Sequence, residues 1–123
     1  MREIKFRGKR LDNGEWVYGC YIFSSGQGLI HEVDSGRRVW TVKPETVGQF
    51  TGFLDKVGKE IYEGDVLQIV DIGESGVSKV FFEDGMWCVN YWESNASLHE
   101  FLTETRVYVI GDIFNNPNLL EDS

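Results

Sequence analysis

The chain has 123 residues, of which 14% are aromatic and 26% are charged, and this composition excludes an intrinsically disordered protein. The length is that of one domain, or one domain with a small appended lobe. Folding would bury about two-thirds of the surface of the unfolded chain, which is enough for a hydrophobic core that needs no metal or disulfide. The net charge is −8. No apolar run approaches the length of a signal peptide or membrane span, so we expect a cytoplasmic chain that does not enter a membrane.

The charge is unevenly distributed along the chain. Residues 1–59 hold ten Lys/Arg against seven Asp/Glu, a net charge of +3, whereas residues 60–123 hold two against thirteen, a net charge of −11. This pattern predicts an electric dipole, with a basic N-terminal element on an acidic body.

The first predicted element is a β-hairpin. Asn13-Gly14 lies between the segments Ile4–Arg10 and Glu15–Phe23, and Asn-Gly supplies the positive φ angles of a two-residue type I′ turn. That turn predicts four cross-strand pairs: Leu11 with Trp16, Lys9 with Tyr18, Arg7 with Cys20, and Lys5 with Ile22. The opposite face is apolar, and we expect it to be the core face. It carries Ile4, Phe6, Val17, Tyr21 and Phe23.

One face of this hairpin interleaves cations with aromatic rings, and we predict it as an interaction surface. It comprises Lys5, Arg7, Lys9, Trp16 and Tyr18. Three interpretations are open: the Lys and Arg stems cover the rings, the face docks on the acidic half of the same or a neighbouring chain, or it binds single-stranded nucleic acid. The net charge of −8 repels a polyanion, so nucleic acid is the least favoured partner.

Glycine turns divide the rest of the chain into short predicted strands. These are Leu29–Val33, Arg38–Val42, Gln49–Leu54, Val66–Ile72, Val77–Phe82, Met86–Trp92 and Arg106–Phe114. Ser24–Gly28 and Gly73–Gly76 are predicted loops. One helix is expected at Leu98–Thr103, where Ser97 and Glu100 would form a capping box. The pattern predicts an all-β fold, a small β barrel or roll with one short helix.

The stretch GKEIYEGDVLQIV (Gly58–Val70) resembles a motif, but we interpret it as a structural corner. Glycine permits the dihedral angles of a sharp bend, and an adjacent aspartate can accept hydrogen bonds from the turn amides. Glu63 and Asp65 could form a carboxylate pair, but no His, Lys or metal ligand lies close to them in sequence. The residues of the predicted corner are Gly58, Ile61, Tyr62, Gly64 and Asp65.

No other pattern predicts catalysis or a cofactor. The candidate metal ligands Cys20, His31, Cys88 and His99 have no ligand spacing, so we expect no metal site. The Gly26–Gly28 and Gly73–Gly76 segments lack the lysine and following helix of a phosphate-binding loop. Neither Cys20 nor Ser97 has a local base. We therefore predict no catalytic residues, no cofactor and no enzyme activity.

Four segments of the sequence resemble the YopX family of phage and prophage proteins. They are MREIKFRGKRLDNGEWVYG (Met1–Gly19), TVGQFTGFLDKVGKEIYEGDVLQI (Thr46–Ile69), VFFEDGMWCV (Val80–Val89) and YVIGDIFNNPNLL (Tyr108–Leu120). The resemblance implies an SH3-like barrel encoded by a phage or prophage and made in the bacterial cytoplasm. It implies no established activity and no catalytic residues.

We therefore expect one compact unit, with residues 1–45 as an N-terminal hairpin and meander element and residues 46–123 as an SH3-like barrel. The expected function is that of a non-enzymatic accessory protein that binds a host or phage protein and can self-associate into a homo-oligomer. Two alternatives are open. The acidic half could mimic nucleic acid and occupy a basic host protein, or the basic hairpin could bind single-stranded nucleic acid weakly.

Overall fold

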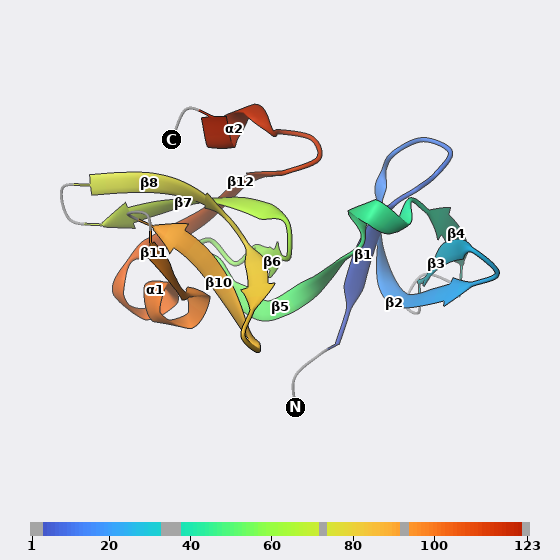
Figure 1. Ribbon diagram of the computed structural model, residues 1–123, viewed down its shortest axis with the longest axis horizontal. Helices are drawn as coiled ribbons and strands as arrows, with labels where there is room; N and C mark the ends of the chain where they lie inside the picture. The colour runs from blue at the N-terminus through green and yellow to red at the C-terminus, as the bar shows by residue number, and fades with distance from the viewer. Residues whose placement is uncertain (1–3, 33–37, 72–73, 92–93, 122–123) are drawn as a thin grey trace. The chain divides into compact units, whose positions relative to one another are not determined.

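A computed structural model describes residues 4–32, 38–71, 74–91 and 94–121 of the chain. Most of these residues lie in antiparallel β-strands, with two short α-helices (Figure 1). The expected all-β class is therefore confirmed. The chain divides into two compact units, Met1–Phe50 and Thr51–Ser123.

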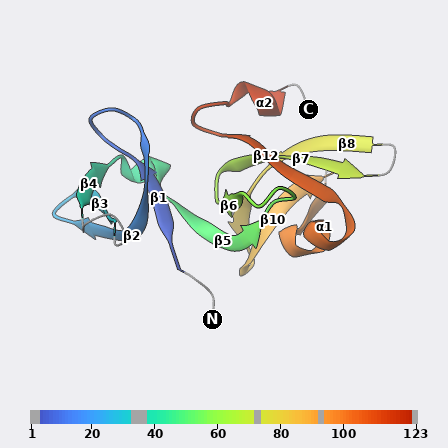
Figure 2. The ribbon, with the colours of Figure 1, turned by 180° about the vertical axis from the view of Figure 1, so that it is seen from behind.

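The first unit is built from neighbouring antiparallel strands. They are β1 (Phe6–Lys9), β2 (Trp16–Ser24), β3 (Gln27–His31), β4 (Val39–Val42) and the first residues of β5 (Gly48–Leu54). Their order across the sheet is β4-β3-β2-β1-β5, and Figure 2 shows β2, β3 and β4 from the opposite side. A short 3-10 helix, η1 (Pro44–Thr46), leads from β4 to β5.

Among the described residues, the core of the first unit contains three buried aliphatic side chains, surrounded by partly buried ones. The buried residues are Val17, Ile30 and Val42, and the surrounding ones are Phe6, Tyr21, Trp40 and Val47. The expected core positions of Phe6, Val17 and Tyr21 are confirmed. Those of Ile4 and Phe23 are wrong, since these side chains are 69% and 60% exposed. Ile4 precedes the first residue of β1, and Phe23 lies near the end of β2, where the strand turns.

The register of the first hairpin differs from the expected one by two residues. Lys9 pairs with Trp16, and Arg7 pairs with Tyr18. The two-residue turn predicted at Asn13-Gly14 is therefore wrong. Because side chains alternate with a period of two, a shift of two residues leaves the same side chains on the same face. The cations and the rings therefore still share one face of the hairpin.

The loop of this hairpin is longer because β4 binds the chain beyond β1. The Arg10 N–H donates to the Glu15 carbonyl at 2.9 Å, which leaves the four residues Leu11–Gly14 in the loop. Arg10 also lies opposite Val42, and the Leu11 N–H donates to the Thr41 carbonyl at 2.9 Å. A strand neighbour distant in sequence thus outweighs the local preference of Asn-Gly for a two-residue turn.

Two other hairpins have the two-residue turn expected for the first. Ser25 and Gly26 have φ angles of 53° and 77° and connect β2 to β3, and Asp84 and Gly85 have φ angles of 53° and 78°. Positive φ at both positions is the type I′ geometry. The tight turn expected at Glu83–Gly85 is confirmed, whereas the predicted loop Ser24–Gly28 contracts to Ser25 and Gly26, because Ser24 pairs with Gln27.

The second unit contains two three-stranded sheets, in the orders β12-β7-β8 and β11-β10-β9, and a pairing of β5 with β6. The strands are β6 (Glu60–Tyr62), β7 (Asp65–Asp71), β8 (Glu74–Lys79), β9 (Phe81–Glu83), β10 (Met86–Tyr91), β11 (Ser94–Ser97) and β12 (Arg106–Asp112). The core residues are Ile61, Leu67, Ile69, Val80, Trp87, Val89, Leu98 and Val107.

These sheets are not closed into a barrel, so the SH3-like detail of the prediction is not confirmed. Only Val80 separates β8 from β9, yet the two strands belong to different sheets. The predicted single strand Val77–Phe82 is therefore interrupted. The predicted loop Gly73–Gly76 is also wrong in its described part, because Ser75 and Gly76 pair with β7.

The expected helix is confirmed as α1 (Leu98–Glu104), but its expected cap is wrong. Ser97 stands at the N-cap position without a side-chain capping bond, and it is the last residue of β11. At the other end, the Thr105 N–H and hydroxyl both donate to the Phe101 carbonyl, at 2.9 and 2.7 Å. A second helix, α2 (Asn118–Glu121), was not expected. In the described part of the chain, no helix is long and apolar enough to cross a membrane.

Three buried aspartates organise the backbone of the second unit. Asp65 and Asp112 lie opposite each other on β7 and β12. Asp65 accepts a hydrogen bond from the Tyr62 N–H at 2.7 Å. Asp112 accepts from the N–H groups of Phe114 and Asn115, at 3.0 and 2.8 Å. Asp112 also accepts the side-chain amide of Asn115, at 3.1 Å. The third aspartate, Asp55, accepts the N–H groups of Val57, Lys59 and Val109, so these carboxylates stabilise turns.

Candidate interaction surface

The predicted interaction surface lies on the β1–β2 hairpin of the first unit. The Arg7 guanidinium carbon lies 4.1 Å from the centroid of the Trp16 ring, and the Lys9 ammonium lies 5.4 Å from the same centroid. These are cation–π contacts, worth about 0.5–1 kcal/mol where exposed and about 2 kcal/mol where desolvated. The register of β1 and β2 brings them together, because Lys9 is the direct partner of Trp16.

The five residues of this cation–aromatic surface differ in exposure. Arg7 is buried, with 6% of its surface exposed, whereas Tyr18 is 42% exposed. Lys5, Lys9 and Trp16 are partly buried. The Lys5 ammonium lies over another ring, that of Phe50, at 5.3 Å. The charged heads of the three cations therefore lie over rings, while Tyr18 is exposed to solvent.

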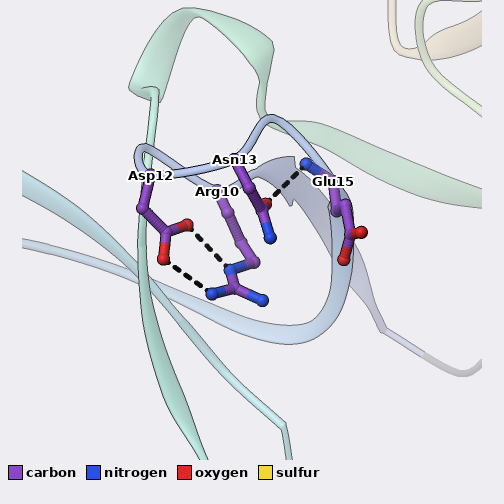
Figure 3. A network of polar contacts seen from close by, with 4 residues as sticks. All are labelled: Arg10, Asp12, Asn13 and Glu15. Carbon is purple, nitrogen blue, oxygen red and sulfur yellow. Dashed lines mark hydrogen bonds and ion pairs between the residues drawn. The ribbon is translucent and has the colours of Figure 1, made fainter.

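The loop that follows β1 is held by polar contacts of its own (Figure 3). Arg10 binds both carboxylate oxygens of Asp12, at 2.9 and 2.6 Å. The hydrogen bond from Arg10 lowers the pKa of the Asp12 carboxyl, and the same bond raises the pKa of Arg10. Asn13 accepts the N–H of Glu15 at 2.9 Å, which is the local turn that asparagine favours.

An open groove of about 530 Å³ lies beside this loop in the first unit. Its lining is formed by Leu11, Asp12, Gln27, Val39, Trp40 and Thr41. The Arg10 guanidinium stacks on the Trp40 ring at 3.8 Å. The Trp40 indole nitrogen is buried and makes no hydrogen bond to the described residues. Among the described residues that line the groove, Asp12 supplies a carboxylate, and this carboxylate is already paired with Arg10.

The predicted corner residues belong to two neighbouring turns of the second unit: Gly58 lies in the turn between β5 and β6, and Gly64 lies at the bend between β6 and β7. Gly58 and Gly64 both have a φ of +89°, which favours glycine. The Gly64 N–H donates to the Val80 carbonyl, and the Gly64 carbonyl accepts the Ile113 N–H, both at 2.9 Å. Asp65 binds the Tyr62 backbone at this bend. The interpretation of this segment as a structural corner stays a prediction. A structural corner needs hydrogen bonds that hold the turn backbone, and these are bonds of that kind.

Tyr62 and Ile61 are buried beside the bend, with 2% and 0% of their surfaces exposed. The Tyr62 hydroxyl donates to Glu60 at 3.0 Å. Among the described residues, no three His, Cys, Asp or Glu side chains gather as metal ligands. The bend is therefore held by the buried side chains of Ile61 and Tyr62 and by hydrogen bonds to the backbone.

The structure also brings together two side chains that sequence reasoning kept apart. Cys20 on β2 and His31 on β3 are direct cross-strand partners. The signal for this pair was the Ser25-Gly26 turn, which fixes the register of β2 and β3 but was interpreted as part of a longer loop. The other cysteine, Cys88, is buried in the second unit, and burial raises the pKa of its thiol.

Comparison with known proteins identifies relatives of the whole chain. The model of a family described as YopX protein matches residues 5–121. The crystal structure of protein EF1440 from Enterococcus faecalis is similar to this chain, with a TM-score of 0.64 and 22% sequence identity over 98% of this chain and 99% of that chain. At this identity the likeness shows a shared fold. No curated protein matches the sequence.

Proposed function

Because the chain belongs to the YopX protein family, as its four sequence segments predicted, we propose that it is a phage- or prophage-encoded accessory protein of the bacterial cytoplasm. It acts by binding another protein, not by catalysing a reaction. A non-enzymatic role is supported by Asp55, Asp65 and Asp112, whose carboxylates accept backbone N–H groups at turns.

The observation that carries the proposal is the cation–aromatic surface on the β1–β2 hairpin. Trp, Tyr and Arg are the residues that contribute most often to binding energy at protein interfaces. Arg7 is already held on Trp16, so it loses little conformational freedom when a partner binds. Tyr18 is 42% exposed and supplies an aromatic ring for contact.

The charge of the two units supports an acidic partner surface. Residues 1–50 hold eight Lys/Arg against six Asp/Glu, a net charge of +2, and residues 51–123 hold four against fourteen, a net charge of −10. The acidic unit of a second copy therefore complements the cation–aromatic surface electrostatically. Head-to-tail association would use this complementarity, although symmetric closure is the commoner arrangement among oligomers.

Sedimentation velocity at low and high salt tests self-association. We expect the wild-type mass to rise with protein concentration at low salt and to fall towards the monomer at high salt. Lys9→Glu combined with Tyr18→Ala should weaken association about tenfold or more. Lys59→Glu is the control, because it makes the same charge change at an exposed side chain of the acidic unit and should not weaken association. A monomer under every condition would contradict self-association.

Affinity purification from a lysogenic host, followed by mass spectrometry, tests binding to a different protein. Wild type and Lys59→Glu should retain the same partner, and Lys9→Glu with Tyr18→Ala should lose it. A partner that all three variants retain equally would contradict the role of this surface.

The net charge of −10 on the second unit favours a second candidate, an acidic mimic of nucleic acid that occupies a basic host protein. It has weaker support, because Asp55, Asp65 and Asp112 are buried and do not contribute to an acidic outer surface. A pull-down at low salt that retrieves no DNA-binding protein would contradict it. Direct binding of nucleic acid by the hairpin has less support still, because Arg7 is already buried.

A further inference from the structure

Cys20 and His31 lie side by side on one face of the β2–β3 ladder. They are direct antiparallel partners, and such partners project to the same face with Cβ atoms about 4.5–5.5 Å apart. Cys20 is exposed and His31 is partly buried. Among the described residues, neither side chain makes a hydrogen bond to the other. Both can therefore reach a common third atom.

Two features of the backbone hold this pair in register. The type I′ turn at Ser25-Gly26 sets β2 against β3. Gly19, the residue before Cys20, has a φ of +156°, and a Cβ built on it would lie 2.0 Å from the His31 carbonyl oxygen. Only glycine lets β2 approach β3 this closely. The two strands are therefore close together beside Cys20 and His31.

A thiolate and an imidazole are the two ligands most typical of structural zinc sites, with Zn–S of about 2.3 Å and Zn–N of about 2.0–2.1 Å. Zinc prefers four ligands in a tetrahedron, and one chain offers two here, since no larger ligand group occurs in the described part of the chain. Ile22 and Val39 flank the pair on the same face and are 45% and 49% exposed. Two such faces brought together would bury this apolar surface around an ion.

We propose that Cys20 and His31 form half of a binding site for a thiophilic divalent cation of the zinc class, and that the same pair of a second copy completes it. The product is a Cys2His2 site that joins two copies through their β2–β3 faces. Each Cys20 thiol releases its proton to water as the thiolate binds the ion. This proposal does not rest on the cation–aromatic surface, since the two use different residues and different forces.

Cobalt(II) and zinc(II) are the probes of the test, added to the full chain under reducing conditions. We expect a thiolate-to-cobalt charge-transfer absorption that saturates at one ion per two chains. With zinc, light scattering should show a mass twice the 14.1 kDa of the chain, and EDTA should return it to the monomer. High salt should leave the zinc-dependent dimer intact, which separates it from electrostatic self-association.

Cys20→Ser should abolish the absorption, and His31→Gln should weaken cobalt binding at least about tenfold. His99→Gln is the matched control, at an exposed position of α1, and should change neither result. Circular dichroism checks that each variant is folded. An absorption that persists in Cys20→Ser, a one-to-one complex with monomer mass, or a dimer that resists EDTA and needs only an oxidant would overturn the proposal.

Discussion

The carboxylate of Asp55 accepts a hydrogen bond at 2.9 Å from the backbone N–H of Val109, which lies 54 residues further along the chain. Its other oxygen accepts the N–H groups of Val57 and Lys59, at 3.0 and 2.8 Å. One buried side chain therefore closes the turn after β5 and attaches that turn to β12. The Lys56 N–H, which donates to the Val107 carbonyl at 2.9 Å, adds a second bond between the same elements.

Replacing Asp55 by alanine should destabilise the protein by roughly 2–4 kcal/mol, because buried N–H groups bound to a charged acceptor would lose their partner. Asp55→Asn should cost less, since the amide keeps one acceptor oxygen but turns an NH2 group towards an N–H donor. Urea unfolding measures both effects. Glu45→Gln, an exposed change, should stay within about 0.5 kcal/mol. Equal stability of Asp55→Ala and wild type would contradict this role of the carboxylate.

Gly19→Ala should destabilise the first unit by roughly 3 kcal/mol or more, because the new Cβ would collide with the His31 carbonyl and the backbone must shift. Gly14→Ala is the matched comparison. Gly14 also has a positive φ, of +75°, but a Cβ there meets no atom within 4 Å. It should cost only about 1–2 kcal/mol, the penalty of a left-handed residue. Thermal unfolding should rank the two variants in this order, and the reverse order would contradict the close approach of β2 and β3.

Arg7→Lys should destabilise the protein by about 1 kcal/mol, because a guanidinium stacks flat on an indole and an ammonium does not. The emission of Trp16 should shift as its ring loses this cover, although the other tryptophans dilute the signal. Lys9→Arg serves as the control, because it keeps a cation beside the same ring. No change in stability for Arg7→Lys would show that the stacking contributes little.

Stability should fall at high pH because of Cys88. Burial raises the pKa of its thiol, and the charge of Glu83 adds to the shift. Above the ordinary value of 9.0, the unfolded chain loses this proton while the folded chain keeps it, so the free energy of unfolding decreases as the pH rises. Below 9.0 both states are protonated and this effect vanishes. Urea midpoints across this range should decline less in Cys88→Ala than in wild type or Cys20→Ser.

Alkylation provides a second readout for the two cysteines. In the folded protein iodoacetamide should modify the exposed Cys20 and spare the buried Cys88, and both should react after unfolding. Mass spectrometry counts the adducts. Rapid double modification of the folded chain would contradict the burial of Cys88.

Local chemistry predicted several elements correctly. Asp84-Gly85 has the residues of a type I′ turn, and it forms one. The helix α1 was expected at Leu98–Thr103 and forms there; Leu98 lies in the core of the second unit, and Phe101 and Leu102 pack against that core. In each case the residues that decide the conformation lie within a few positions of one another, so the sequence carries the information directly.

The sequence by itself therefore determined the all-β class, most strand positions, the helix α1 and the family. Tertiary structure decided the rest, because those features depend on partners far along the chain. The hydrogen bond from the Leu11 N–H to the Thr41 carbonyl lengthened the first loop. The Asp55 carboxylate accepts the N–H of Val109, which is distant in sequence. Cys20 met His31 because Gly19 has no side chain to keep β3 away. Long-range hydrogen bonds and packing of this kind contribute free energy that cannot be inferred from neighbouring residues. In the first hairpin they outweigh the smaller local preference of Asn13-Gly14 for a two-residue turn.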